Sequence, residues 1–404
     1  MKKIFFVFLI FTCLLFSQTQ IFLQITKNLL EKANVLLIFK IDKNDFSEKF
    51  INTFSNDLKL SGYFKLEGIK FTENIEKTEK EIMSGIIITG EKKQDILNIK
   101  VKDGIEKKIL YENNYKFIQN PREFAHIICD DIVEKLTGKP GIATSKVFFT
   151  SDKTGKNQIY LIDYDGYNLI QITDLDYFVN FPRYLEGNYI LFVSYQDGWP
   201  KIARMDILTK KIETLIAKPG LNACMSPNLK TKEIAVVLSQ SGNPEIYISD
   251  FKGEIRKRLT NHNGIDSSPS FSPDGKNIVF VSDRDGKPQI YIMDRDGFGT
   301  RRISYISNYC TSPSFSPDGN FIAYVFADKG GYSLAIYDLN TTKTKIIKNL
   351  NCEEISWAPN SRHIAYSTSG KSQKIMIVDI FTNEIRELIS GNFKCISPNW
   401  FYFK

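Results

Sequence analysis

The sequence is poor in the side chains that most often carry out chemistry. It has three histidines in 404 residues, and His126, His262 and His363 fall in segments that we expect to lie apart. No pair of potential metal ligands stands at a useful spacing, and no Gly-x-Ser-x-Gly nucleophile motif is present. We therefore expect no catalytic residue, no metal site and no cofactor.

Two Asp-x-Asp-Gly stretches, at residues 163–166 and 294–297, superficially resemble calcium loops. A calcium loop supplies further oxygen ligands after these positions, and both stretches lack them. Because Asp-Gly between two strands is adequately explained as a turn, we favour the turn and keep calcium as the alternative.

Long runs of one charge are missing as well. The formal net charge of +7 is mild, and Lys and Glu are scattered along the chain, so nothing indicates nucleic-acid binding. A membrane span needs about 18 consecutive apolar residues, and no segment beyond the N-terminus provides them. The mature protein is therefore expected to be soluble.

The N-terminus has the pattern of a secretory signal peptide. Met1-Lys2-Lys3 is positively charged, Ile4–Phe16 is apolar, and small or polar residues follow. This order is typical of an export signal, although no Ala-x-Ala cleavage site is present and an uncleaved anchor is the alternative. We predict a signal peptide over residues 1–19.

Cysteine is scarce, and its number in the mature chain is odd. Cys13 lies in the signal peptide, which leaves Cys129, Cys224, Cys310, Cys352 and Cys395. An odd number in an exported protein predicts at least one free thiol. The last three stand at equivalent positions of a repeat, where either small buried side chains or a disulfide between neighbours would fit.

That repeat is the main feature that the sequence does contain. Ser270–Asp283 and the residues up to Ser304 read as short strands separated by turns, with Pro273-Asp274-Gly275 as turn chemistry. Each copy has an aromatic or apolar anchor on its first strand, and the anchors are Tyr184, Met225, Phe271, Phe315, Trp357 and Trp400. Their spacing of about 40–45 residues is typical of a four-stranded propeller blade.

The leftover strands complete a ring. Residues 146–172 supply three strands without a first strand, and Cys395–Trp400 is a first strand with nothing after it. We therefore predict an all-β six-bladed propeller of WD40-like repeats over residues 141–404, closed by the C-terminal strand. Closure removes the edges that an open array would expose.

Residues 20–140 have a different pattern. Several segments between residues 21 and 111 alternate like strands, and helical spacing is found in Asp45–Leu60, Glu73–Met83 and Pro121–Leu136. Asp45 is positioned to cap the first helix. Strands mixed with helices predict a small α/β domain, joined to the propeller by a linker at residues 138–141.

Five motifs carry a resemblance to a known family. They are the repeat motifs Phe271–Lys276 and Phe315–Gly319, the junction Glu134–Gly138, the first-blade turn Asp163–Asn168 and the helix end Asp57–Phe64. In these motifs the chain resembles the TolB family of the Tol–Pal system of Gram-negative bacteria. The second blade departs from the repeat, because residues 184–187 replace its Ser-Pro-Asp-Gly.

The resemblance implies a periplasmic binding protein rather than an enzyme, and we expect a monomer. In this family the propeller face binds the peptidoglycan-associated lipoprotein Pal, and the N-terminal segment of the mature chain binds the inner-membrane protein TolA. The system holds the outer membrane to the wall and supports its invagination during cell division. A secreted propeller enzyme or a carbohydrate-binding propeller of the cell envelope is the alternative function.

Candidate contacts for the lipoprotein lie on one face of the propeller. Alternation of the strands places the loops before the first strands on the same face as the loops between second and third strands. A rigid ring with loops gathered at one end can serve as a recognition surface. The alternative for each single residue is that it is an ordinary solvated loop residue, because few contact residues contribute most of the binding energy. The candidates are Asn222, Asp266, Ser267, Thr311, Glu353, Trp199 and Arg284.

Candidate contacts for a TolA-like protein lie in residues 20–27, which alternate imperfectly between apolar and polar. They are Ile21, Phe22, Leu23 and Ile25. A free strand of this kind can add to the edge of a partner's sheet. Alternatively the segment pairs within its own domain, and a segment that does both acts as a switch.

Overall fold

The computed structural model describes residues 31–82 and 85–403. The predicted signal peptide and the candidate contacts between Ile21 and Ile25 lie outside these residues. Two compact units make up the chain, and the boundary between them falls between Thr144 and Ser145. Within the described residues, no helix combines the length and the apolar character needed to cross a bilayer.

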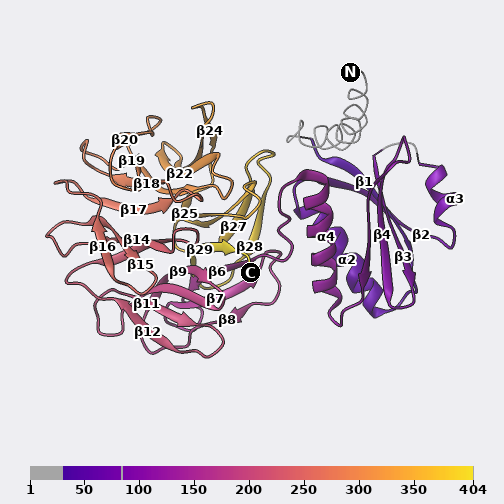
Figure 1. The fold of residues 1–404 in the computed structure, drawn as a ribbon, viewed down its shortest axis with the longest axis horizontal. Coiled ribbons are helices and arrows are strands. Elements are labelled where there is room, and N and C mark those ends of the chain that lie inside the picture. Colours follow the sequence, from indigo (N-terminus) through magenta and orange to yellow (C-terminus); the bar gives the residue numbers. More distant parts are fainter. Residues whose placement is uncertain (1–30, 83–84, 404) are drawn as a thin grey trace, which may run out of the picture. The chain divides into compact units, whose positions relative to one another are not determined.

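The first unit is a five-stranded sheet in the order β2-β1-β3-β4-β5. β1 runs parallel to β2 and β3, and the remaining neighbours are antiparallel. The helices α2 and α4 lie side by side against the sheet (Figure 1). The elements are β1 (Ala33–Lys40), α2 (Asp45–Leu60), β2 (Phe64–Phe71), α3 (Ile75–Lys80), β3 (Ile86–Lys93), β4 (Ile96–Asp103), β5 (Ile109–Lys116) and α4 (Pro121–Thr137).

An aromatic cluster joins this sheet to its two long helices. Phe39 of β1 meets Phe50 and Phe54 of α2 edge to face, with ring centroids 6.1 and 6.4 Å apart. Phe124 of α4 lies 5.4 Å from Phe50. All four side chains are buried. Aromatic pairs of this geometry add about 0.5–1.5 kcal/mol beyond the burial of their area.

The helix ends follow capping chemistry, with one correction to the expectation. Asn44 caps α2, because its side chain accepts the Ser47 N–H at 2.9 Å while Ser47 Oγ accepts the Asn44 N–H. The prediction of Asp45 as the cap was therefore wrong by one residue, since only Asn44 forms this reciprocal pair. The predicted helix from Pro121 is confirmed, and Gly138 ends it with a left-handed φ of 66°.

The second unit is a six-bladed β-propeller, which confirms the predicted fold. Each blade is an antiparallel sheet of four strands. The inner strands are β29 (Cys395–Phe401), β9 (Val179–Glu186), β13 (Asn222–Asn228), β17 (Asp266–Phe271), β21 (Cys310–Phe315) and β25 (Cys352–Trp357). The second strands, in the same order of blades, are β6 (Lys146–Ser151), β10 (Tyr189–Ser194), β14 (Glu233–Leu238), β18 (Asn277–Ser282), β22 (Phe321–Asp328) and β26 (His363–Thr368).

The third and fourth strands complete each blade toward its outer edge. The third strands are β7 (Gln158–Asp163), β11 (Lys201–Asp206), β15 (Glu245–Asp250), β19 (Gln289–Asp294), β23 (Gly331–Asp338) and β27 (Ile375–Asp379). The outer strands are β8 (Ile170–Gln171), β12 (Ile212–Ile216), β16 (Ile255–Arg258), β20 (Arg301–Arg302), β24 (Thr344–Ile347) and β28 (Ile385–Ile389).

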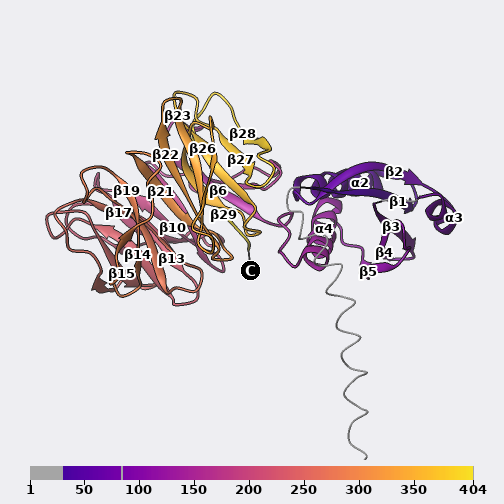
Figure 2. The ribbon, with the colours of Figure 1, turned by 90° about the horizontal axis from the view of Figure 1, so that it is seen from above.

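The chain closes the ring with its C-terminal strand, as predicted. β29 pairs antiparallel with β6, and the two strands lie together in both views (Figure 1, Figure 2). Trp400 Nε1 donates to Ser145 Oγ at 2.7 Å. Phe401 stacks on Phe148 with ring centroids 4.5 Å apart. Backbone pairing, a buried hydrogen bond and aromatic stacking therefore all contribute to closure.

The pairing registers correct one of the six predicted anchors. Phe271, Phe315 and Trp357 each pair with the first isoleucine of their second strand. In the third blade the residue that pairs in this way is Pro227, opposite Ile234. Met225 is thus two residues too early, because a proline did not fit the aromatic pattern used to find the anchors.

Candidate partner-binding face of the propeller

All six inner strands begin at one face of the propeller, here called the entry face. The first residue of each inner strand pairs with the end of its second strand, as Asn222 does with Leu238 and Cys310 with Phe326. The loops between second and third strands reach the same face. The first residues are Val179, Asn222, Asp266, Cys310, Cys352 and Cys395.

The three cysteines in this ring are equivalent, as the repeat predicted. Cys310, Cys352 and Cys395 are fully buried, and each is a free thiol. Burial raises the pKa of Cys352 and of Cys395 to about 12, so both thiols stay protonated at neutral pH. Protonated, inaccessible thiols are inert, and the position acts as a small apolar site. The expectation of at least one free thiol is confirmed.

Two predicted contact residues of the entry face have internal roles. Asn222 is buried, and its Nδ2 donates to the carbonyl oxygens of Lys218 and Gly220 at 2.7 and 3.1 Å. Asp266 is fully buried, and its two carboxylate oxygens accept from Arg284 Nη2 at 3.1 and 3.0 Å. These groups hold loops in place, so their contact with a partner stays a prediction.

Arg284, another predicted contact, is held on three sides. Its Nε donates to Ser282 Oγ at 2.8 Å. Its guanidinium lies over the rings of Phe280 and Tyr291, 5.3 and 4.9 Å from their centroids. A guanidinium fixed by a carboxylate and two aromatic rings is pre-organised, and about a fifth of this side chain is exposed, at 19%.

The other predicted residues differ in how much surface they offer. Trp199, between β10 and β11, is 71% exposed, whereas Ser267, Thr311 and Glu353 are half-buried in or beside the inner strands. Glu353 Oε2 accepts from Gln373 Nε2 at 3.0 Å. Burial and the neighbouring Glu354 raise the pKa of Glu353. Of the predicted set, Trp199 presents the largest free apolar surface.

Sequence reasoning missed an apolar crescent on this face. The residue just before the inner strand is apolar in four consecutive blades, at Phe178, Leu221, Ile265 and Tyr309. Phe178, Ile265 and Tyr309 are 51%, 47% and 40% exposed. The same offset in each blade was the signal that would have found them. Exposed apolar residues gathered around one opening are typical of a docking surface.

On the opposite face, exposed apolar residues stand on the outer turns between third and fourth strands. Examples are Tyr167, Leu208 and Phe298. Phe298 directly follows one of the two Asp-x-Asp-Gly stretches, residues 294–297, where Asp294 Oδ1 accepts the N–H groups of Asp296 and Phe298 at 2.9 Å each. This is the hydrogen bonding of an Asx turn, which accounts for the aspartate.

Comparison with known proteins agrees with this architecture. The PD40 family, described as the TolB beta propeller domain, matches residues 133–404, more than half of the chain. The chain belongs to the TolB beta propeller family. A crystal structure of TolB from Acinetobacter baumannii has a TM-score of 0.79 and 24% identity, covering 92% of this chain and 96% of that chain. This likeness shows that the two share a fold.

Curated TolB relatives match over shorter stretches. A "Protein TolB homolog" of Chlorobium chlorochromatii is 32% identical over 156 residues, which are 38% of this chain and 35% of the relative. A "Tol-Pal system protein TolB" of Desulfosudis oleivorans is 30% identical over 181 residues, which are 44% and 41% of the two chains. The chain thus spans less than half the length of the curated TolB relatives it matches.

Proposed function

We propose that this chain is a periplasmic, non-enzymatic adaptor of a Tol–Pal system, which binds a Pal-like lipoprotein through the entry face of its propeller. In this role it contributes to outer-membrane integrity and to invagination during cell division. The observation that carries the proposal is the apolar crescent of Phe178, Leu221, Ile265 and Tyr309, with Trp199 exposed on the same face.

The chemistry of the entry face supports a protein partner. Interface cores are enriched in aromatic residues and arginine and are surrounded by polar groups. The crescent supplies the aromatic part, and the fixed Arg284 supplies a cation that needs little ordering on binding. A few such anchors carry most of the binding energy of an interface.

The experiment compares two variants with matched exposure on opposite faces. Trp199 and Phe298 are each 71% exposed, so Trp199→Ala and Phe298→Ala remove similar free surfaces. The mature chain is titrated with the soluble domain of the Pal-like lipoprotein from the same organism. A hot-spot loss of about 2 kcal/mol, or roughly thirtyfold in Kd, is expected for Trp199→Ala and no change for Phe298→Ala.

Two results would contradict the assignment. Equal affinity of both variants would remove the entry face from the interaction, and a loss confined to Phe298→Ala would move the interaction to the opposite face. Phe178→Ala and Tyr309→Ala, whose side chains are also exposed, extend the test along the crescent.

A second interaction is proposed for the N-terminal segment. Residues 20–27, with Ile21, Phe22, Leu23 and Ile25, are proposed to add as a strand to the sheet edge of a TolA-like protein. Deleting these residues from the mature chain is expected to abolish binding of the TolA-like domain and to leave binding of the lipoprotein intact. Unchanged binding of the TolA-like domain would refute this proposal alone.

A further inference from the structure

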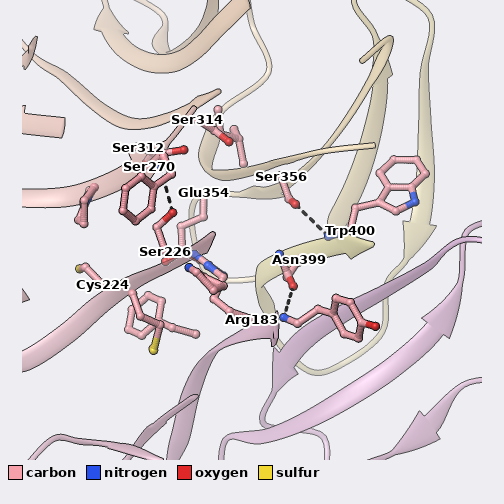
Figure 3. A pocket seen from close by; sticks show the side chains of 18 of the residues that line it. Arg183, Cys224, Ser226, Ser270, Ser312, Ser314, Glu354, Ser356, Asn399 and Trp400 are labelled. Carbon is pink, nitrogen blue, oxygen red and sulfur yellow. Dashed lines mark hydrogen bonds between the residues drawn. The ribbon is translucent and has the colours of Figure 1, made fainter. Parts of the chain in front are cut away.

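The centre of the propeller contains a cavity of about 460 Å³, a volume in the range of small-molecule sites. Its wall is built from the inner strands, and the side chains that line it include a set of serines (Figure 3). Among the described residues that line it, Arg183 and Glu354 alone carry a charge. The serines are Ser226, Ser268, Ser270, Ser312, Ser314 and Ser356.

Arg183 breaks a ring of hydrogen bonds between blades. Its equivalents, the fifth residues of the other inner strands, are Ser226, Ser270, Ser314, Ser356 and Asn399. In four of these the side-chain oxygen accepts the backbone N–H of the next blade. The bonds are Phe271 to Ser226 (3.2 Å), Phe315 to Ser270 (3.2 Å), Trp400 to Ser356 (2.9 Å) and Tyr184 to Asn399 (2.7 Å).

Arg183 therefore stands where the repeat places a small, neutral hydrogen-bonding side chain. Within the described part of the chain, Arg183 Nη1 donates to the carbonyl oxygen of its own neighbour Pro182 at 2.8 Å. Burial lowers the pKa of this guanidinium, while Glu354 and Cys224 act in the opposite direction. An arginine on the wall of a cavity, without a carboxylate partner in contact, retains donors for a ligand.

Glu354 breaks a second ring, formed by the third residue of each inner strand. The equivalent residues have a left-handed backbone, with φ from 49° at Cys224 to 56° at Phe181. Phe181 is the bulky member of this ring, and a bulky residue at such φ is a strained outlier. Backbone strain of this kind gathers at functional sites. The blade of Glu354 lacks this conformation, and its bulge is displaced to Cys352–Ile355.

The carboxylate of Glu354 is only partly satisfied. Its Oε2 is buried and has no hydrogen-bond partner among the described residues. No ion pair joins it to Arg183 in the described part of the chain, although both line the same cavity. A buried carboxylate oxygen without a donor is costly, so a ligand that donates to it would recover binding energy.

The two charges restrict the chemistry of a ligand. Arg183 would attract an anion and Glu354 would repel it. A cation would be attracted by Glu354 and repelled by Arg183. We propose that this cavity binds a small zwitterion of the amino-acid or dipeptide class, with its carboxylate on Arg183, its ammonium group on Glu354 and its polar backbone among the serine hydroxyls. This site is separate from the docking surface of the entry face.

The direct test titrates the full mature chain with L-alanyl-L-alanine by calorimetry, beside two blocked analogues. N-acetylation removes the ammonium charge, and C-terminal amidation removes the carboxylate. A hydrogen bond to a charged group contributes about 1.5–3 kcal/mol, so each block is expected to weaken binding at least about tenfold. No heat of binding at millimolar dipeptide, or equal binding of all three peptides, would overturn the proposal.

Two variants test which side chain binds the carboxylate of the dipeptide and which binds its ammonium group. With Arg183→Gln the free and amidated peptides should bind equally, because no cation remains to distinguish them. With Glu354→Gln the free and acetylated peptides should bind equally. Arg301→Gln, which removes an exposed arginine of the outer strand β20, is the control and should keep the full discrimination. If Arg183→Gln still binds the free peptide more tightly than the amidated one, or Glu354→Gln still binds it more tightly than the acetylated one, the proposed orientation is wrong.

Discussion

In the α/β unit one aromatic cluster joins the sheet to its helices, whereas the core of the propeller is divided among the contacts between blades. The cluster around Val279 and Tyr324 joins the blades of β18 and β22, and the one around Leu334 and Ile364 joins those of β23 and β26. A ring of such contacts depends on every blade, because one missing strand leaves an exposed edge and a broken interface.

The two units can be followed separately in one experiment. The three tryptophans of the chain, Trp199, Trp357 and Trp400, all lie in the propeller, and the helices that the structure describes all lie in the α/β unit. Tryptophan fluorescence therefore reports the propeller, and the helical far-UV circular dichroism reports the α/β unit. A mutation confined to one unit should move one signal and leave the other.

The largest effect is expected from removing the closing strand. Deleting residues 395–404 takes away the buried side chains of Cys395, Trp400 and Phe401 and the whole pairing with β6. Loss of one buried aromatic side chain already costs about 3–5 kcal/mol. The cooperative fluorescence transition should therefore disappear in urea unfolding, while the helical signal keeps its midpoint.

The control for this deletion is Phe298→Ala, which removes a ring that is 71% exposed and should leave both midpoints in place. A truncated chain that kept a native fluorescence transition would show that the ring does not need its sixth inner strand. A simultaneous loss of the helical signal would show that the two units unfold as one.

The difference between the units also explains what the sequence could and could not predict. The same pattern of strands and turns recurs in every blade, so each copy checks the others. Closure by Cys395–Trp400 could therefore be inferred from strand patterns alone. The single copy of α2 offered no such check, and Asn44 and Asp45 are equally good caps by type. Only the reciprocal bond from Ser47 decides between them.

The candidate sites were harder to predict, because position in a repeat says little about exposure. Asn222 and Asp266 are polar residues at loop ends, yet both side chains are buried and form hydrogen bonds within the propeller. Arg183 directly precedes the anchor Tyr184, as Ser270 precedes Phe271, so its departure from the repeat was visible in the sequence and was overlooked. The displaced bulge at Glu354 is visible only from the pairing register. The two-residue error at Met225 hid only the equivalence of Ser226 with Arg183.

The second-largest effect is expected in the α/β unit. Phe54→Ala removes a fully buried ring that contacts Phe39 and stacks on Phe50 at 5.7 Å. The unit should lose about 3–5 kcal/mol, seen as a lower urea midpoint of the helical signal with unchanged fluorescence. Phe71→Ala, which truncates a ring that is 47% exposed, is the matched control. A shift of both signals would contradict the separation of the units.

Acid should affect the two units with opposite signs. Burial raises the pKa of Asp379, but the charges of His363 and Arg362 outweigh it and hold this pKa below its usual range. Burial raises the pKa of Asp130 despite hydrogen bonds from Thr144. The Asp379 contribution is present above the unfolded value of about 3.9 and is lost as pH falls through the lower folded value. The Asp130 contribution is present below about 3.9 and is lost as pH rises through the higher folded value.

Isosteric variants isolate these two contributions. Asp379→Asn removes the negative charge that accepts from Arg362 Nε at 2.7 Å. It should cost the propeller about 2 kcal/mol at neutral pH and should flatten its loss of stability below about pH 4. Asp130→Asn should remove the stabilisation that the α/β unit gains on acidification. Unfolding in urea at several pH values measures both slopes, and unchanged slopes would exclude these carboxylates as the titrating groups.

The smallest effect concerns one backbone angle at the end of α4. Gly138 has a φ of 66°, where an L-residue costs about 1–2 kcal/mol, so Gly138→Ala should lower the stability of the α/β unit by about 1 kcal/mol. Gly68→Ala is the matched control, because its φ is not left-handed and its new Cβ would lie 3.5 Å from Leu36 Cδ1, an ordinary contact. It should be neutral or slightly stabilising, since alanine restricts the unfolded chain. Equal losses in the two variants would mean that the added methyl group, and not the backbone angle, sets the cost, and fluorescence should stay unchanged in both.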